Sequence, residues 1–262
     1  MTVAPQTVVL LCGGKGLRMR ADGGGPPKSL VRIGGRPIIW HVMKIYSQFG
    51  YRDFVLTLGH RGEEIVEYFE RYLRSSCDST LTFDPPDRVT HSLLPDDERA
   101  WSLTFLQTGE DTQTGGRIKR AADHIRGDHF LATYTDGVAD VNIAQLVRQH
   151  LSSGLAATML SVFTPIRFGI VEAQNGIVTR FEEKPTRSVR INGGFFAFHK
   201  SILDRIGGDD DRLEMDVLMP LAAEGRLGCL EHDGFWHCVD TPKDLLELQR
   251  RWDSGHAPWK SW

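Results

Sequence analysis

The chain of 262 residues is poor in cysteine, has no long apolar run and carries no strong excess of either charge. Its four cysteines, Cys12, Cys77, Cys229 and Cys238, match the spacing of neither a zinc knuckle nor a disulfide framework, so we interpret them as reduced structural thiols. No stretch reaches the about 18 apolar residues of a membrane span, and the N-terminus lacks the pattern of a secretory signal. We therefore expect a soluble, cytoplasmic protein without a membrane partner.

The formal net charge is −3, and the basic and acidic residues are interspersed along the sequence. A surface that binds polyanions requires clustered lysine and arginine, so this pattern argues against nucleic acid as a partner. The length suits a single α/β domain over residues 1–262. Two segments stand apart: a polar excursion at about 75–100, and a tryptophan-rich C-terminal tail that either packs back on the domain or contacts another subunit.

Short apolar runs alternate with amphipathic segments through the first half of the chain. Such alternation is typical of a mostly parallel sheet covered by helices on both faces, which is a three-layer α/β/α fold. The predicted strands are 8–12, 53–59 and 129–137, and the predicted helices are 37–49, 63–73 and 142–151.

The second half is richer in strands, so we expect the central sheet to be mixed, though mainly parallel. A strand is predicted over 156–163, and Asn175-Gly176 predicts a hairpin over 169–185. The last helix is expected to have Thr241 as its N-cap and Pro242 as its first residue.

Glycines and charged residues follow the predicted strands, where ligands bind in open α/β sheets. After the first strand comes G-G-K-G-L-R, residues 13–18, whose backbone N–H groups could approach phosphate oxygens and whose arginine adds a permanent charge. Such glycine turns are also common for purely structural reasons. The loop alone therefore leaves both interpretations open.

Two aspartates also stand at strand ends. Asp136 could cap a turn and Asp240 could simply precede a helix, but two carboxylates beside a phosphate loop favour a shared Mg²⁺. Lys28 follows two prolines and Lys184 precedes one. Each lysine alone could be merely solvated, whereas together they could neutralise two phosphates.

Seven motifs in this order resemble the sugar-1-phosphate nucleotidylyltransferases, most closely the glucose-1-phosphate cytidylyltransferase branch. The resemblance spans essentially the whole chain and includes the tail RRWDSGHAPWKSW. The motifs are LLCGGKGLRM, PPKSL, TGEDTQTGGRIKR, YTDGVADVNI, FEEKP, INGGFFAF and VDTPKDL.

This resemblance implies a Rossmann-like nucleotide-diphospho-sugar transferase fold. It also implies attack of a sugar 1-phosphate on the α-phosphorus of a nucleoside triphosphate with release of pyrophosphate, and a homo-oligomeric assembly. The expected substrates are CTP and α-D-glucose 1-phosphate. Positioning and charge neutralisation carry such a step, because the nucleophile is already an anion.

The family's functional residues map onto specific positions of this chain. The implied catalytic residues are Arg18, Lys28, Asp136, Lys184 and Asp240, with Mg²⁺ held by Asp136 and Asp240. The implied nucleotide contacts are Leu11, Cys12, Gly13, Gly14, Lys15, Gly16, Leu17, Arg18, Lys28, Thr112, Arg117 and Thr135. The implied sugar-phosphate contacts are Glu183, Lys184, Gly193, Gly194 and Glu214.

Three departures from the family pattern bear on substrate choice. Leu17 replaces a threonine or serine, Thr135 replaces a glycine, and the stretch MRADGGGPP lacks an acidic run. The alternatives are therefore the same chemistry with UTP, dTTP or another sugar 1-phosphate. A non-catalytic regulatory protein that binds sugar nucleotides is a third possibility, although a binding module has little need of two metal carboxylates.

Overall fold

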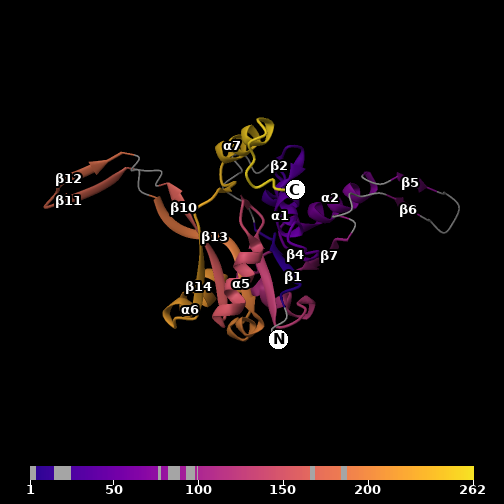
Figure 1. The fold of residues 1–262 in the computed structure, drawn as a ribbon, viewed down its shortest axis with the longest axis horizontal. Coiled ribbons are helices and arrows are strands. Elements are labelled where there is room, and N and C mark those ends of the chain that lie inside the picture. Colours follow the sequence, from indigo (N-terminus) through magenta and orange to yellow (C-terminus); the bar gives the residue numbers. More distant parts are fainter. Residues whose placement is uncertain are drawn as a thin grey trace.

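The computed structural model describes residues 4–14, 25–75, 78–81, 89–92, 98, 100–165, 169–183 and 188–262. Its centre is a seven-stranded sheet in the order β14-β10-β13-β8-β1-β4-β7, in which only β13 runs against the others (Figure 1). The prediction of a mixed, mainly parallel sheet is confirmed. The strands are β1 Thr7–Leu11, β4 Asp53–Leu58, β7 Ser102–Gln107, β8 His129–Tyr134, β10 Ala157–Pro165, β13 Ser188–His199 and β14 Leu227–His232.

Helical segments cover both faces of this sheet, which confirms the three layers. In β1, Val8 and Leu10 face one apolar core while Val9 and Leu11 face the other, so the whole strand is buried. The first core is covered by α1 Ile38–Ser47, α2 Gly62–Ser75, α5 Ile143–Ser153 and α7 Pro242–Asp253. The second is covered by α4 Thr114–Arg120, the 3-10 helix η4 Lys200–Arg205, the π-helix η5 Leu213–Leu218 and α6 Met219–Ala223.

The predicted local signals mostly lie where the sequence places them. Thr241 forms a capping box with Asp244, and Asn175 and Gly176 both have positive φ in the turn of the predicted hairpin. Pro37 is the N-cap of α1 rather than its first helical residue, because its ψ of 152° is still extended. The predicted strand 129–137 ends at Tyr134. The chain then starts a second strand, β9 Gly137–Ala139.

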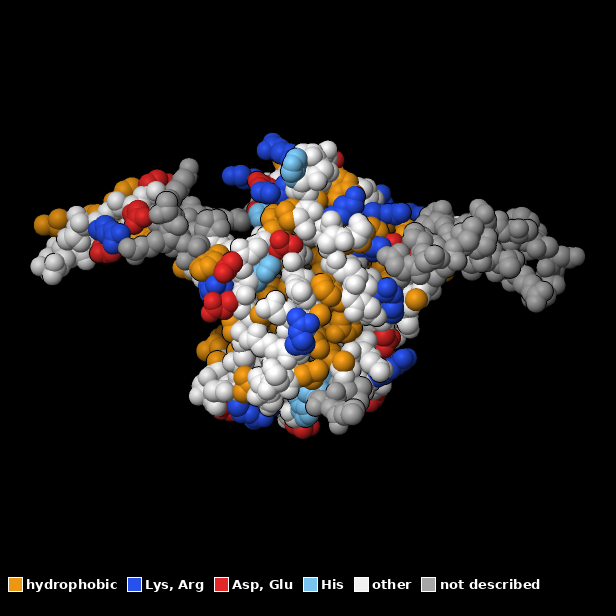
Figure 2. Space-filling view, in the orientation of Figure 1, with side chains coloured by type: hydrophobic (Ala, Val, Ile, Leu, Met, Phe, Trp, Pro, Cys, Tyr) orange, Lys and Arg blue, Asp and Glu red, His pale blue; other side chains and the backbone are white. Residues whose placement is uncertain are grey.

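Two hairpins project from opposite sides of the body (Figure 1). One joins β5 Asp78–Leu81 to β6 Val89–Ser92, inside the polar excursion. The other joins β11 Ile170–Gln174 to β12 Ile177–Glu182 and carries exposed hydrophobic side chains far from the core (Figure 2). Among the described residues, no helix combines the length and the apolar character needed to cross a bilayer.

The tryptophan-rich tail packs back onto the domain. Trp259 is fully buried beside His41 of α1, and the rings of Trp252 and Trp262 lie against the same histidine. Of the two possibilities for the tail, the structure shows an intramolecular contact. The C-terminal residues thus complete the core beneath α1.

His41 is expected to make stability depend on pH. Its Nε2 donates to the Ile33 carbonyl at 2.9 Å and its Nδ1 accepts from Trp259 at 3.4 Å, which is the pattern of a neutral ring. Burial lowers the pKa of His41 to about 4, so the unfolded chain binds a proton below pH 6.5 while the folded chain does not. The contribution of His41 to the free energy of unfolding should be fully present above pH 6.5. It should fall by on the order of 3 kcal/mol as the pH drops to about 4. Urea unfolding at several pH values measures this, and His41→Gln should remove only part of the fall, because burial also lowers the pKa of His150 to about 4.

Candidate active site

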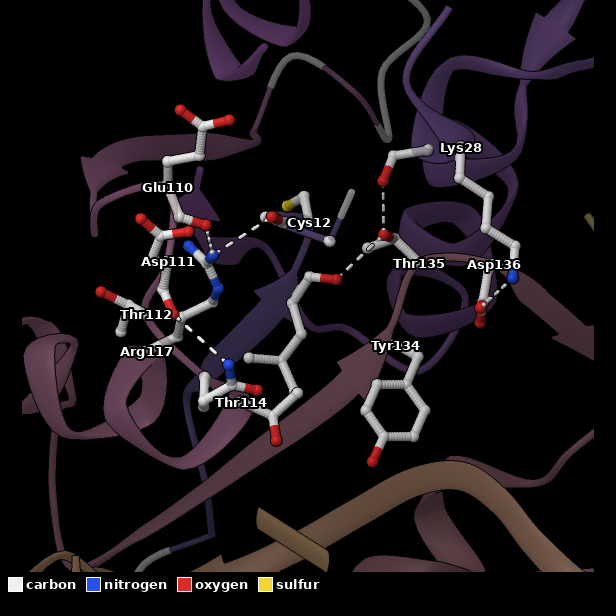
Figure 3. Close-up of a pocket in the computed structure, with 15 residues that line it drawn as sticks. Cys12, Lys28, Glu110, Asp111, Thr112, Thr114, Arg117, Tyr134, Thr135 and Asp136 are labelled. Atoms are coloured by element: carbon white, nitrogen blue, oxygen red, sulfur yellow. Dashed lines mark hydrogen bonds and ion pairs between the residues drawn. The ribbon is translucent and has the colours of Figure 1, made fainter. Parts of the chain in front are cut away.

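The largest described cluster of expected site residues surrounds a cavity of about 410 Å³ at the carboxyl ends of β1 and β8 (Figure 3). Parallel strands deliver their following loops to one edge, so these residues meet although they are far apart in sequence. Lys15, Gly16, Leu17, Arg18 and Lys184 lie outside the described residues. The cavity is lined by Leu11, Cys12, Gly13, Gly14, Lys28, Ser29, Glu110, Asp111, Thr112, Gln113, Thr114, Arg117, Tyr134, Thr135 and Asp136.

Lys28 bridges the two aspartates that the sequence singled out. Its Nζ lies 2.7 Å from Asp136 Oδ2 and 2.6 Å from Asp240 Oδ1. Burial alone would lower the pKa of Lys28, but the two carboxylates outweigh burial and raise it. The ammonium is therefore charged, and it occupies the space between two charged oxygens.

A small second sheet holds the two aspartates together. Asp136 precedes β9, and Asp240 follows β15 Trp236–Cys238, which pairs antiparallel with β9. The backbone N–H of Val239 also donates to the carbonyl of Asp136 at 2.8 Å. This pairing brings the carboxylates from two distant segments to one lysine.

Arg117 connects three loops on one side of the cavity. From α4, its guanidinium donates to the carbonyls of Gly13, Leu58, Gly109 and Glu110 at 3.0–3.3 Å, and also to Thr108 Oγ1. These groups lie at or just after the ends of β1, β4 and β7, so one side chain connects the ends of three strands. Burial lowers the pKa of Arg117, and this arrangement of acceptors compensates the buried charge.

Arg117 also explains why residue 13 is glycine. A Cβ on Gly13 would lie 2.1 Å from the Arg117 Cζ atom, well inside contact distance. The sequence predicts the glycine in a phosphate loop, and the resemblance implies that the arginine contacts the nucleotide. In the structure the two are packed against each other, and the guanidinium faces backbone carbonyls.

Thr135, which departs from the family's glycine, has a defined structural place. Its buried Oγ1 lies 2.6 Å from Ser29 Oγ and donates to the Leu11 carbonyl at 3.1 Å. The hydroxyl thereby connects β1, the end of β8 and the 3-10 turn η2 Lys28–Leu30 that presents Lys28. The departure adds a tie that fixes the backbone near that lysine.

A smaller cavity of about 30 Å³ adjoins the first, since Tyr134 and Asp136 line both. Gly194 has a φ of +79°, and a Cβ there would lie 2.7 Å from the Tyr134 ring. The Trp236 indole donates to the Gly193 carbonyl at 2.8 Å. The predicted glycine pair thus lies at the edge of this space, lined by Thr133, Tyr134, Asp136, Gly137, Asn192, Gly193, Gly194, Phe195 and Trp236.

Glu214 and Glu183 have different surroundings. Glu214 accepts hydrogen bonds from Tyr134 Oη and, at 3.2 Å, from Thr114 Oγ1, which line the cavities, although Glu214 itself lines neither. Glu183 is exposed at the base of the β11–β12 hairpin and lines neither cavity. Of the two glutamates, the structure connects Glu214 to the site through Tyr134 and Thr114 and leaves Glu183 outside it.

A family model described as nucleotidyl transferase matches residues 7–254. The chain belongs to this family. It is 41% identical to the glucose-1-phosphate cytidylyltransferase of Salmonella typhi, over 97% of this chain and 98% of that protein. It is 40% identical to a probable glucose-1-phosphate cytidylyltransferase of Bacillus subtilis, over 97% and 99%. The resemblance inferred from the motifs is confirmed.

The fold is also that of solved relatives of this nucleotidyl transferase. HddC from Yersinia pseudotuberculosis, in a crystal structure with GMP-PN, superposes with a TM-score of 0.69 over 94% of this chain and 99% of its own. At 19% identity, that likeness supports the Rossmann-like fold alone. Enzymes of this class act on a nucleotide and a sugar phosphate and generally use a divalent metal.

Several residues of the nucleotidyl transferase site were missed by the sequence analysis. Asn192 and Tyr134 lie inside quoted motifs, and the position of Tyr134 at the end of β8 was a usable signal, whereas Asn192 lies within β13. Trp236 had none, because its role depends on the pairing of β15 with β9. Burial raises the pKa of the Cys12 thiol to about 12, which supports the prediction of an unreactive structural thiol there.

Proposed function

We propose that this nucleotidyl transferase condenses CTP with α-D-glucose 1-phosphate to give CDP-glucose and pyrophosphate. The observation that carries the proposal is the Lys28, Asp136 and Asp240 cluster at the rim of the nucleotide-sized cavity. The near-complete coverage of relatives named glucose-1-phosphate cytidylyltransferase supports the choice of substrates.

The reaction exchanges one phosphorus–oxygen bond for another. A phosphate oxygen of the sugar 1-phosphate attacks the α-phosphorus, and the bond from that phosphorus to the bridging oxygen of the β-phosphate breaks. The electron pair leaves with pyrophosphate, so no proton needs to be removed from the nucleophile. The chain must hold two anions in line and compensate their charge.

Asp136 and Asp240 fit a divalent cation, which we propose to be Mg²⁺. They supply hard carboxylate oxygens, and the Lys28 ammonium within 2.7 Å of both shows that the pair accommodates a cation. No cluster of three or more acidic, histidine or cysteine ligands occurs among the described residues, so phosphate oxygens and water would complete the shell. When bound, the ion would withdraw charge from the α-phosphate.

Other residues would bind and orient the two substrates. Gly13 and Gly14 would let the triphosphate approach the backbone, and Arg117 would hold that loop in place. Gly193 and Gly194 would leave room for the sugar, while contact of Glu214 with the sugar stays a prediction of the resemblance. Roles for Arg18, Lys184 and the remaining residues of the loop stay predictions of the resemblance.

Pyrophosphate release tests the proposed function. The purified protein with Mg²⁺ is incubated with each pairing of CTP, UTP, dTTP, ATP and GTP with several sugar 1-phosphates. We expect the highest kcat/KM for CTP with glucose 1-phosphate and none when the sugar phosphate is omitted. A higher kcat/KM with UTP, dTTP or another sugar 1-phosphate would show that the proposed substrates are wrong. Pyrophosphate release from no pairing would favour a non-catalytic regulatory protein.

A homo-oligomer also stays a prediction, supported by the β11–β12 hairpin. Val171 pairs across the strands with Phe181, and their exposed fractions are 54% and 64%, with Val178 at 56%. An isolated two-stranded hairpin is marginally stable, so a second copy of the chain is the proposed cover for this apolar face. Light scattering of the purified protein and of Phe181→Lys measures the assembly. The cytoplasm as its location likewise stays a prediction.

A further inference from the structure

We infer that Lys28 is the resident cation of the metal site, and that the nucleotide must draw its ammonium away before a divalent ion can bind Asp136 and Asp240. The inference rests on the proposed function and extends it to the order of binding. The metal would bind tightly only when the nucleotide is present, and the free protein would bind divalent ions weakly.

The first support is the place of the ammonium. It contacts one oxygen of each carboxylate at 2.6–2.7 Å, which is the distance of a strong charge-assisted hydrogen bond. A divalent ion held by the same two carboxylates would share this space with a like charge. Because the repulsion acts over only a few ångströms at a partly buried site, the two cations should exclude each other.

The second support is that the backbone of Lys28 is fixed while its side chain is long. Pro27 precedes the turn, Leu30 N–H donates to the Pro27 carbonyl at 2.8 Å, and Ser29 is held by Thr135. The flexible four-carbon stem of lysine can swing without movement of this turn. An ammonium that leaves the aspartates therefore stays at the site.

The third support is the place to which the Lys28 ammonium would move. Lys28 also lines the 410 Å³ cavity, so a triphosphate bound there would offer anionic oxygens within reach of the same side chain. The phosphate oxygens would pair with the ammonium in place of the two aspartates, and they would also supply oxygen ligands to the metal. By linkage, the nucleotide then raises metal affinity and the metal raises nucleotide affinity by the same factor.

Mn²⁺ binding without nucleotide tests this inference. Isothermal titration of the full chain at pH 8 compares the wild type with Lys28→Met, which removes the charge and keeps the length. We expect Mn²⁺ to bind Lys28→Met at least about tenfold more tightly than the wild type. Lys28→Arg keeps a cation and should remain as weak as the wild type.

Two controls separate the metal site from a general effect of charge. Lys200→Met removes a lysine at the opposite end of the sheet, where Nζ donates to the Ile125 carbonyl, and should leave Mn²⁺ affinity unchanged. Adding Asp240→Asn to Lys28→Met should abolish the gain. Circular dichroism checks folding, and Lys28→Gln replaces Lys28→Met if that variant does not fold.

A second titration measures the coupling. CTP should raise Mn²⁺ affinity by a larger factor in the wild type than in Lys28→Met, because only the wild type must displace an ammonium. Equal Mn²⁺ affinity in the nucleotide-free wild type and Lys28→Met would overturn the inference. That result is independent of which base or sugar is used, so it is distinguishable from failure of the pyrophosphate assay.

Discussion

Replacing Asp136 with asparagine is expected to lower kcat by about 10²- to 10³-fold with the fold intact. The amide keeps the size of the carboxylate but removes one of the two charged oxygen ligands available to the metal, so stabilisation of charge at the α-phosphate is lost. The change also leaves Lys28 with one charged partner at 2.6 Å instead of two. Initial rates with saturating CTP, glucose 1-phosphate and Mg²⁺ measure the effect.

The matched control for Asp136→Asn is Asp204→Asn, which changes an exposed aspartate in η4. It should retain wild-type kcat and the wild-type unfolding midpoint. Asp240→Asn should resemble Asp136→Asn, because both carboxylates contact one ammonium. Turnover of Asp136→Asn within a few fold of wild type would contradict the shared-metal proposal.

Arg117→Met is expected to raise the KM for the nucleotide by at least tenfold and to destabilise the fold by roughly 3 kcal/mol. Its guanidinium donates to five acceptors, several of them buried, and methionine would leave these without a donor. The loops at the ends of β1, β4 and β7 would then lose the hydrogen-bond donor that they share. The KM for glucose 1-phosphate should change much less, because the arginine lines only the larger cavity.

Arg120→Met provides the control on the same helix. Arg120 is exposed and its guanidinium pairs with Asp209 at 2.5–2.8 Å, so its loss should leave the unfolding midpoint nearly unchanged and both KM values unchanged. Urea unfolding gives the stability of both variants. An Arg117→Met protein with normal nucleotide KM would refute the positioning role.

The sequence predicts the central sheet well because its strands are buried on both faces. Runs such as residues 8–11 are continuously apolar, and the helix signals around Thr241 and Asn175 depend on local backbone chemistry. β7 was missed because it is a half-exposed edge strand without a clear period, SLTFLQ. α4 was missed because its seven residues, TGGRIKR, contain two glycines.

The site residues were predicted by type and strand position, but their partners were not. That Lys28 would lie between Asp136 and Asp240, rather than beside a phosphate, depends on the distant pairing of β9 with β15. From the sequence, Arg117 is predicted to be a cation that contacts a ligand. Only the fold shows that its donors are already used by backbone carbonyls.

The pairing of β9 with β15 has a consequence for biosynthesis. Lys28 and Asp240 are separated by 212 residues, and Asp240 reaches the cluster only after β15 has added to β9. A nascent chain that has already formed β1, β4 and β8 therefore still lacks one of the two carboxylates proposed to bind the metal. The proposed pair of metal carboxylates is therefore complete only once residues 236–240 have been made and have paired with β9.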